Sequence, residues 1–403
     1  MTINISKLRE DFPVFKNNKK FTYFDNACTS LRPRSVIEAM NEYYELHPSC
    51  HNRTLHSFGV QTTKKFEGAR KVVSEFIGAS NPKEIIFTRN TTEAINIISK
   101  GINWQSGDRI LTSDMEHNSN LLPWQFLVKE KGVLLNHFEI NDQYSVNLEE
   151  FEKILSENKY KLVSFHHTSN VTGSSLPVKE LTEIAKKYGA LVLIDCAQAM
   201  TTSTINVEEL NADFIAFSFH KCLGPSGIGA LYGKIDALEQ LTPMLYGGET
   251  VIDSTYESCT FSEIPYRFEA GLQNYSGAFG ARAAIEYIKS IGISNISNHI
   301  VKLNSILTEA LLKEDRVTIL GPKDPPLRGG IVNFLVEGLD LGQISLILDK
   351  SHRIMVRSGV HCCHSWYHKK ELKPSLRVSL GPYNTEEEVR HFIEVILPII
   401  RFF

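Results

Sequence analysis

The stretch KLVSFHHTSNVTGSSLPVKELTEIAKKYGALVLIDCA, residues 161–197, decides the fold. It begins and ends in short apolar runs, 161–169 and 190–197, whose length and composition are typical of buried strands. Between them LPVKELTEIAKKYGA has the pattern of a helix, with Pro177 near its first turn and Gly189 at its end. A strand, a helix and a strand at this spacing predict a parallel pair within a doubly wound sheet.

The same alternation continues on both sides of this stretch. EIIFTRN (84–90), DRILTSD (108–114) and DFIAFSFHK (213–221) are further buried-strand candidates, and TTEAINIISKG after the first has the periodicity of a helix. The chain is then helical from Gly277 to about Leu312. GGIVNFLVE, IMVRSG and SLRVSLG predict strands of a smaller unit, which closes with a helix that opens with a capping box.

These elements predict an α/β protein with two domains. We expect a large domain at 21–285 that carries a mostly parallel, doubly wound sheet, and a smaller α+β domain at 286–403. The first 20 residues form an N-terminal segment that we expect to pack near the small domain.

Composition limits the classes of partner. The 403 residues include 43 basic and 46 acidic side chains, and no basic run or stripe predicts a nucleic-acid partner. No uninterrupted apolar run is as long as a membrane-spanning helix requires, and the start, MTINISKLREDFPVF, lacks the apolar core of a signal peptide. Seven scattered cysteines are typical of reduced thiols. We therefore expect a cytoplasmic protein without a membrane partner.

Polar groups follow the predicted strands, at the edge where parallel sheets bind ligands. Asn90 is a predicted helix cap with Glu93 three residues later, so the amides of Thr91, Thr92 and Glu93 would face an anion. The alternative is a plain helix cap without a ligand.

A buried acid and a buried lysine are predicted at two neighbouring strand ends. Asp195 ends a very hydrophobic strand, where it needs a cationic partner such as a pyridinium nitrogen, unless it caps a helix. Lys221 ends another strand beside Ser218 and His220, and desolvation suits a lysine to Schiff-base chemistry, although most lysines are solvated. With His117 and Asn170, which also follow predicted strands, these groups are the parts that hold pyridoxal 5′-phosphate (PLP).

RSGVHCCHSWYHK, residues 357–369, is the most cysteine- and histidine-rich segment. Its Cys362, Cys363, His364 and His368 give the spacing C-C-H-x-x-x-H, and no C-x-x-C occurs in the chain. Adjacent cysteines rarely both ligate one ion, so buried thiols beside surface histidines are favoured over a metal site.

The chain resembles class V, fold-type I PLP enzymes, most closely the SUF-type (group II) cysteine desulfurases and selenocysteine lyases. The resemblance covers nearly the whole chain and is carried by ordered blocks: DFPVF, YFDNA, TTEAIN, MEHNSNLLPWQ, HTSNVTGS, IDCAQA, FSFHKCLGPSGIGALYG, YRFEAG, RSGVHC and LRVSLGPYNTEEEV. It implies a homodimer that converts L-cysteine, or selenocysteine, to L-alanine and passes sulfur through an active-site persulfide to an acceptor protein, as in iron–sulfur cluster assembly. It implies PLP as the cofactor and no metal.

The resemblance also implies a role for single residues. Lys221 would form the Schiff base and move the substrate's α-proton, and Cys362 would attack the substrate sulfur. Asp195 would face the pyridine nitrogen and Gln198 the ring hydroxyl, and His117 would stack on the ring and take part in catalysis by moving protons. The other implied contacts are Thr91, Thr92, Ser218 and His220 for the phosphate, Asn170 for cofactor and substrate, Arg377 for the substrate carboxylate, and Arg53 for the partner subunit's site.

Two positions depart from the family's pattern. Leu272 stands where the family often has a threonine whose hydroxyl reaches the partner's phosphate, and Val360-His361-Cys362 stands for His-His-Cys, with Cys363 as an extra thiol. Two alternatives remain: another class V enzyme, such as an aminotransferase, lyase or epimerase, and a subunit without catalysis. Adjacent side chains of an extended loop point in opposite directions, so we predict Cys362, rather than Cys363, as the persulfide carrier.

Overall fold

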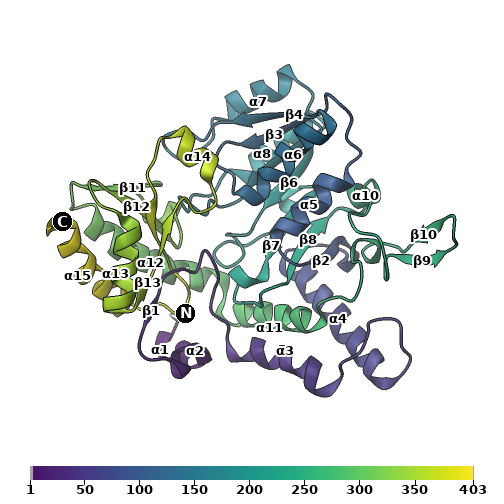
Figure 1. Ribbon diagram of the computed structural model, residues 1–403, viewed down its shortest axis with the longest axis horizontal. Coiled ribbons are helices and arrows are strands. Elements are labelled where there is room, and N and C mark those ends of the chain that lie inside the picture. Colours follow the sequence, from purple (N-terminus) through teal and green to yellow (C-terminus); the bar gives the residue numbers. More distant parts are fainter. Residues whose placement is uncertain (1–2, 403) are drawn as a thin grey trace.

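The computed structural model describes residues 3–402, and its largest element is a seven-stranded sheet (Figure 1). The order across this sheet is β2 (Ile85–Thr88), β8 (Gly229–Gly233), β7 (Phe214–Ser218), β6 (Leu191–Asp195), β5 (Leu162–His166), β3 (Arg109–Ser113) and β4 (Leu134–Phe138). Only β8 runs against the others, because it is antiparallel to both β7 and β2. The predicted mostly parallel sheet is confirmed.

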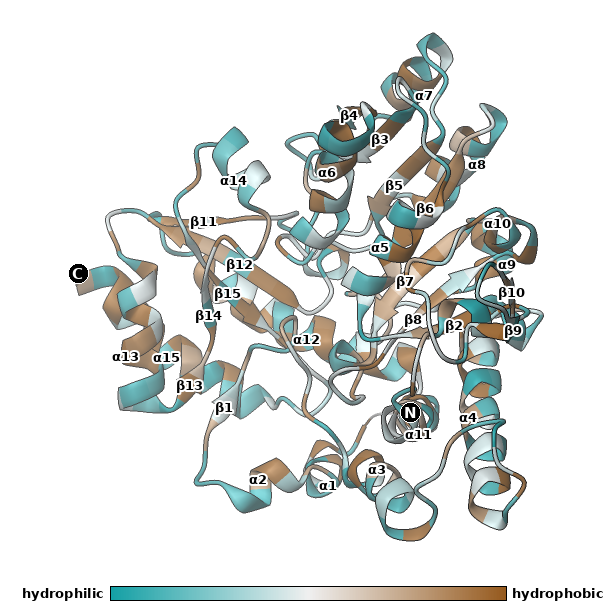
Figure 2. Ribbon diagram, turned by 45° about the vertical axis from the view of Figure 1, so that its right-hand side comes forward, coloured by the Kyte–Doolittle hydropathy of each residue, from teal (hydrophilic) through white to brown (hydrophobic). Residues whose placement is uncertain are grey.

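Helices cover both faces of this sheet, which is why its central strands are buried throughout. On one face lie α5 (Thr91–Gly101), α6 (Leu122–Lys131) and α10 (Ile235–Glu239). The other face packs against α4 (Ser57–Phe76), α7 (Leu148–Glu157), α8 (Val178–Lys187) and α11 (Tyr275–Ile291). Along β5, Leu162 joins the first core, and Val163 and Phe165 join the second. Figure 2 shows these hydrophobic strands between the helices.

A second, antiparallel sheet lies beside the large one, on the left in Figure 1. Its order is β11 (Val317–Ile319), β12 (Ile331–Val336), β15 (Ser375–Ser379) and β14 (Arg357–Gly359). The helices of this part are α12 (Ile293–Leu311), α13 (Leu341–His352), the short α14 (His364–Lys369) and α15 (Glu386–Phe402). The predicted capping box of α15 is confirmed, since the Glu388 amide donates to Thr385 Oγ1 and the Thr385 amide to Glu388 Oε2, each over 3.1 Å.

The N-terminal helices α1 (Ile5–Glu10) and α2 (Pro13–Asn17) pack against the segment that leads into α15. Arg9 Nη1 pairs with Glu388 Oε1 at 2.8 Å, and the rings of Phe12 and Tyr383 are 4.8 Å apart. The next residues form β1 (Thr22–Tyr23), parallel to β13 (Ile354–Met355) of the C-terminal part. The division at 20 and 285 stays a prediction, and α11 runs across the second boundary.

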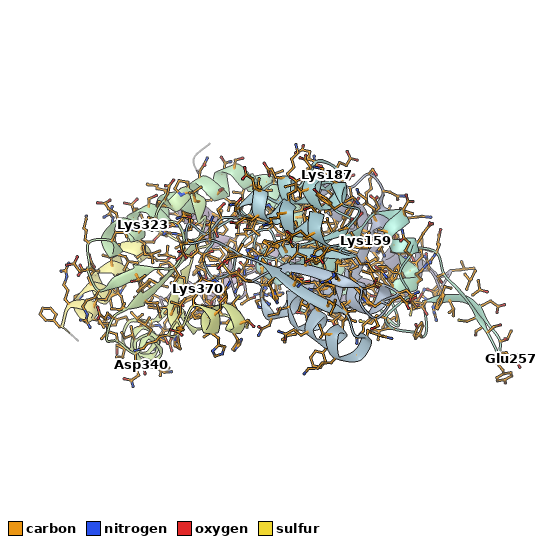
Figure 3. All side chains as sticks on the ribbon, turned by 90° about the horizontal axis from the view of Figure 1, so that it is seen from above. Lys159, Lys187, Glu257, Lys323, Asp340 and Lys370 are labelled. Atoms are coloured by element: carbon orange, nitrogen blue, oxygen red, sulfur yellow. The ribbon has the colours of Figure 1, made fainter. Side chains whose placement is uncertain are left out.

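Helices α3 (Arg34–Leu46), α9 (Val207–Leu210) and a projecting hairpin complete the chain. The hairpin consists of β9 (Val251–Ser254) and β10 (Cys259–Phe261), and Figure 3 shows its tip at Glu257 standing well clear of the body. Within residues 3–402, no helix combines the length and the apolar character that a membrane crossing requires.

Candidate active site

A pocket opens where β5, β6 and β7 end, between the large sheet and the small one. It encloses about 880 Å³ of empty space, open solvent at its mouth included, which is ample for a small cofactor and its substrate. The pocket brings together most of the residues predicted from the sequence: Thr91, Thr92, His117, Asn170, Asp195, Gln198, Ser218, His220, Lys221 and Arg377. Cys362 lies just outside the lining, with His361 of its own loop inside it.

Lys221 and Asp195 form the charged centre of the pocket. After β7 the chain turns through a short 3₁₀ helix, η3 (Phe219–Lys221), which leaves the lysine partly buried. Burial lowers the pKa of Lys221; Asp195 opposes this effect and Arg377 adds to it. Burial likewise raises the pKa of Asp195, against Lys221 and the Ala197 amide, which donates to Asp195 Oδ1 over 2.9 Å. The site therefore favours a neutral amine, and it holds an acid that a cationic ring nitrogen would stabilise in its charged form.

His166 is a second buried group beside Asp195 that sequence reasoning missed. The two residues are paired across β5 and β6, and His166 Nδ1 lies 2.8 Å from Oε1 of the buried Glu116. Burial lowers the pKa of His166, but the Glu116 charge outweighs it and the net pKa is raised. Among the described residues, its Nε2 has no hydrogen-bond partner. The only signal in the sequence was a histidine at a strand end, which is too common to single out.

His117 is held as a neutral ring over the pocket. It caps the 3₁₀ helix η2 (Asn118–Asn120), and its Nδ1 accepts a hydrogen bond from the Ser119 amide over 3.0 Å. Burial first, and then the charge of Lys221, lowers its pKa to about 3. An imidazole that stays uncharged can stack on another aromatic ring without bringing a second cation into the site.

The N-terminus of α5 lies at the far end of the pocket, and its predicted cap is confirmed. Asn90 Oδ1 accepts from the Glu93 amide over 3.0 Å. The expectation of three free amides is correct only for Thr92, because the Glu93 amide donates to Asn90 and the Thr91 amide donates to Ser218 Oγ over 2.8 Å. The Thr92 amide remains for an anion at the positive end of the helix dipole, and the hydroxyls of Thr92 and Ser218, which also line the pocket, are each paired with a neighbouring hydroxyl over 2.7 Å.

Arg377 is buried in the wall opposite and is incompletely satisfied. Its Nη1 donates to the Asn170 carbonyl over 2.9 Å and its Nη2 pairs with Asp25 Oδ1 at 3.1 Å. Its Nε has no partner among the described residues. A guanidinium that lines a pocket with unused donors is suited to bind a carboxylate.

The cysteine loop is a tight turn rather than the extended segment that the sequence suggested. The Cys363 amide donates to the Val360 carbonyl over 2.9 Å, and His361 and Cys362 have φ of 49° and 60°. The two thiols nevertheless lie in different surroundings. Arg357 Nη2 donates to Cys362 Sγ over 3.7 Å, whereas Cys363 Sγ is buried and donates to Asn170 Oδ1 over 3.2 Å. Burial raises the pKa of Cys363 far above its ordinary value, so this thiol is a poor nucleophile.

The remaining predicted residues lie on the surface. Arg53 Nε pairs with Glu249 Oε1 at 2.5 Å, outside the pocket lining, and Leu272 is 68% exposed. His364 Nδ1 lies 3.0 Å from the Asn118 side chain. Within residues 3–402, no group of three or more histidine, cysteine, aspartate or glutamate side chains is arranged to hold a metal ion.

The donor set of the pocket fits PLP. The ligand would need a carbonyl near Lys221, a ring nitrogen near Asp195 and an anionic tail near α5, and these protein groups line one continuous pocket. Three buried nitrogen atoms of this lining lack hydrogen-bond partners among the described residues: His166 Nε2, His361 Nδ1 and Arg377 Nε. Such atoms cost free energy unless a ligand or water satisfies them, which supports a polar ligand here.

Comparison with known proteins identifies a matching family, and relatives that are similar over nearly the whole chain. The family described as aminotransferase class-V matches residues 22–392. A probable cysteine desulfurase from Halalkalibacterium halodurans is 38% identical over 393 residues, which cover 96% of each chain. One from Pyrococcus abyssi is 39% identical over 397 residues, which cover 98% of this chain and 97% of that protein. The apo structure of a cysteine desulfurase from Thermococcus onnurineus NA1 superposes with a TM-score of 0.94, at 38% identity, and covers 100% of this chain and 99% of that one.

Proposed function

The chain belongs to the class-V aminotransferase family, and from that premise we propose that it is a PLP-dependent cysteine desulfurase of the SUF type. The observation that carries this proposal is Cys362, whose thiol lies 3.7 Å from the Arg357 guanidinium at the edge of the pocket. A transaminating enzyme needs no such nucleophile. The products would be L-alanine and a persulfide on Cys362.

PLP, when bound, supplies an electron sink for the bonds at the substrate's α-carbon. Lys221 would hold its carbonyl carbon, Asp195 its ring nitrogen and Gln198 its ring hydroxyl. His117 would cover the ring, and Asn170 would contact it. Thr91, Thr92, Ser218 and His220 would surround the phosphate.

Arg377 and Lys221 would act on the amino acid. The free donors of Arg377 bind the substrate carboxylate and so fix which bond of the α-carbon faces Lys221. Since burial lowers its pKa, Lys221 gives up its proton more readily than an exposed lysine, and Nζ can take the α-proton and return it.

Cys362 would take the sulfur. Its thiolate attacks the substrate sulfur, a sulfur–sulfur bond forms, and the bond between that sulfur and the substrate's β-carbon breaks. The carbon keeps the electron pair and is protonated to give the methyl group of alanine. Arg357 Nη2 donates to Cys362 Sγ over 3.7 Å and so holds the sulfur at the edge of the pocket.

We further propose a cytoplasmic homodimer that delivers its sulfur to an acceptor protein. Large apolar side chains are exposed on α3, on the start of α4 and on the segment that carries the hairpin: Tyr44, Leu46, Leu55, Phe58, Val60, Leu245, Tyr246, Ile252, Tyr256 and Leu272. The Arg53–Glu249 pair joins these two regions. So much exposed apolar surface is typical of a subunit interface, which would bring Arg53 to the partner's site.

The direct test is incubation of the PLP-loaded protein with L-cysteine and a thiol reductant, followed by assays of sulfide and alanine. Equal amounts of both products are expected, and Cys362→Ser should release almost no sulfide. Selenocysteine in a parallel assay would give selenide and alanine, and the ratio of the two rates measures the preference. Pyruvate, or a keto acid without sulfide, would instead indicate another class V activity.

A further inference from the structure

Another cysteine lines the pocket itself, on a segment far from the cysteine loop in sequence. Cys28 lines the same pocket as Lys221 and Arg357, and it is partly buried and not in a disulfide. It follows Asp25, the residue that pairs with Arg377. The desulfurase reaction proposed above gives Cys28 no role.

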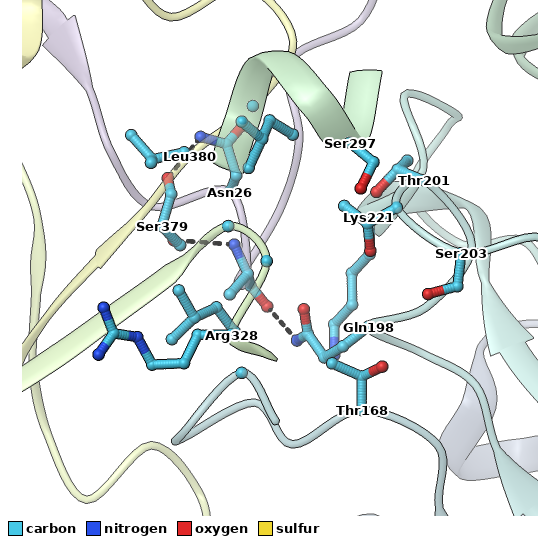
Figure 4. A pocket seen from close by; sticks show the side chains of 18 of the residues that line it. Asn26, Thr168, Gln198, Thr201, Ser203, Lys221, Ser297, Arg328, Ser379 and Leu380 are labelled. Atoms are coloured by element: carbon cyan, nitrogen blue, oxygen red, sulfur yellow. Dashed lines mark hydrogen bonds between the residues drawn. The ribbon is translucent and has the colours of Figure 1, made fainter. Parts of the chain in front are cut away.

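The segment that carries Cys28 is fixed between the two sheets. The Ser30 amide donates to the His220 carbonyl over 2.8 Å, next to Lys221. Gln198 Nε2 donates to the Ala27 carbonyl over 2.8 Å, and the Ala27 amide donates to Ser379 Oγ over 3.0 Å. Figure 4 shows the bonds to Gln198 and Ser379 from the adjoining hollow, with Gln198 beside Lys221. Cys28 is therefore held at the pocket wall.

Arg357 connects the cysteine loop to the pocket. Its Nη2 donates to Cys362 Sγ over 3.7 Å. The same arginine lines the pocket together with Cys28 and Lys221. Cys28, near the start of the chain, and Cys362, near its end, are therefore brought to the same side of the pocket by Arg357.

Cys363, the sequence neighbour of Cys362, does not compete for this position. Its Sγ is buried and donates to Asn170 Oδ1. Cys28 lines the pocket where the substrate would bind, and Cys363 does not.

We propose that Cys28 is a second persulfide site, which takes the sulfane sulfur from Cys362. The Cys28 thiolate attacks the outer sulfur of the Cys362 persulfide, and a new sulfur–sulfur bond forms on Cys28. The old sulfur–sulfur bond breaks, and its electron pair leaves with the Cys362 thiolate beside Arg357. The exchange balances without an oxidant or a reductant, and it frees Cys362 for a second substrate molecule. The inference rests on the proposed function, because desulfuration loads Cys362 first.

The test is a pulse of L-cysteine on the PLP-loaded protein without reductant, followed by rapid alkylation, peptide mass mapping and alanine counting. Wild-type protein should carry added sulfur on Cys28 and Cys362 and release about two alanines per chain in the first burst, against about one for Cys28→Ala. Cys362→Ser should leave Cys28 unmodified. The exposed Cys259 on the hairpin is the internal control and should stay unmodified.

A second readout needs no turnover. Mild oxidation of the resting protein with a diazene thiol oxidant should cross-link Cys28 to Cys362, and the cross-linked peptide should be absent from Cys28→Ser. If alanine forms but sulfur is found on Cys362 alone, this inference is wrong and the proposed function stands. Loading of Cys28 in Cys362→Ser, or equal loading of Cys259, also overturns the relay. If no variant forms alanine from cysteine, the proposed function itself fails and this inference with it.

Discussion

Cys363 Sγ donates a hydrogen bond to Asn170 Oδ1 over 3.2 Å, inside the protein. This bond turns Cys363 away from Arg357, which holds the neighbouring thiol of Cys362. One tight turn therefore separates a packed thiol from an available one. The distinction matters because two adjacent cysteines in the sequence are both candidates for the nucleophile.

We predict opposite results for the two serine variants. Cys362→Ser should lower sulfide release by about two orders of magnitude or more, because a hydroxyl is a poor acceptor of sulfur. Cys363→Ser should keep most activity, and its free energy of unfolding should change by about 1 kcal/mol, since a hydroxyl can also donate to Asn170. Sulfide assays and denaturant melts of both variants check this. Full activity in Cys362→Ser would reverse the assignment.

A second prediction concerns the acid at the end of β6. Asp195→Asn should fold normally, because an amide oxygen can still accept from the Ala197 amide. Its turnover should fall about 10²- to 10⁴-fold, because a neutral amide no longer stabilises a proton on a ring nitrogen. Thermal melts, the visible spectrum of the bound cofactor and alanine assays separate folding, cofactor state and turnover. Normal turnover with an unchanged spectrum would remove Asp195 from this role.

The fold could be predicted for the buried strands, because burial on both faces of a sheet gives an apolar run in the sequence. The strands β5, β6 and β7 are apolar except at Ser164 and at the last residue of each strand, because helices cover both faces of the sheet. The strands that sequence analysis missed lack this signal. β8 is GALYG, whose glycines and alanine have little strand propensity, and only its position between β2 and β7 makes it a strand. β4 is partly exposed and contains polar residues.

The site could be predicted where residues follow parallel strands, because those ends converge at one edge of the sheet. Asp195, Ser218 and Lys221 are in this class. Cys28 and Arg357 are not, because neither follows a strand of the large sheet. Cys28 reaches the pocket because residues 25–30 pack against η3. Arg357 reaches it because β14 lies beside β15 in the small sheet.

A third prediction follows from histidines that are buried without charge. Burial lowers the pKa of His361 to about 2 and that of His167 to about 4, against about 6.5 for an exposed histidine. Below pH 6.5 the unfolded chain therefore binds protons that the folded chain does not, so the free energy of unfolding falls as the pH falls. Each of the two histidines should remove about 2 kcal/mol of stability between pH 7 and pH 5.

Urea melts at these two pH values measure the loss. His167→Gln should show a smaller loss than the wild type by about 2 kcal/mol, because one proton-binding difference is gone. The exposed His391 is the matched control, and His391→Gln should lose as much stability as the wild type does. Equal losses in all three proteins would show that His167 is not neutral in the folded state.

The last prediction concerns assembly. The hairpin carries the exposed side chains of Ile252 and Tyr256 far from the core, as Figure 3 shows for its tip, and a two-stranded hairpin alone has little to stabilise it. We therefore expect the hairpin to pack on a second copy of the chain.

Wild-type protein should sediment as a dimer, and the double change Ile252→Asp, Tyr256→Asp should shift it to monomer with weaker PLP retention. Leu346→Asp is the control, because Leu346 is also exposed but lies on α13, remote from the hairpin in Figure 1, and this variant should stay dimeric. Within the dimer, Leu272→Thr should tighten PLP retention by about 0.5–1.5 kcal/mol if its new hydroxyl reaches the partner's phosphate. A fully active monomer, or dissociation by Leu346→Asp alone, would contradict an interface built on the hairpin.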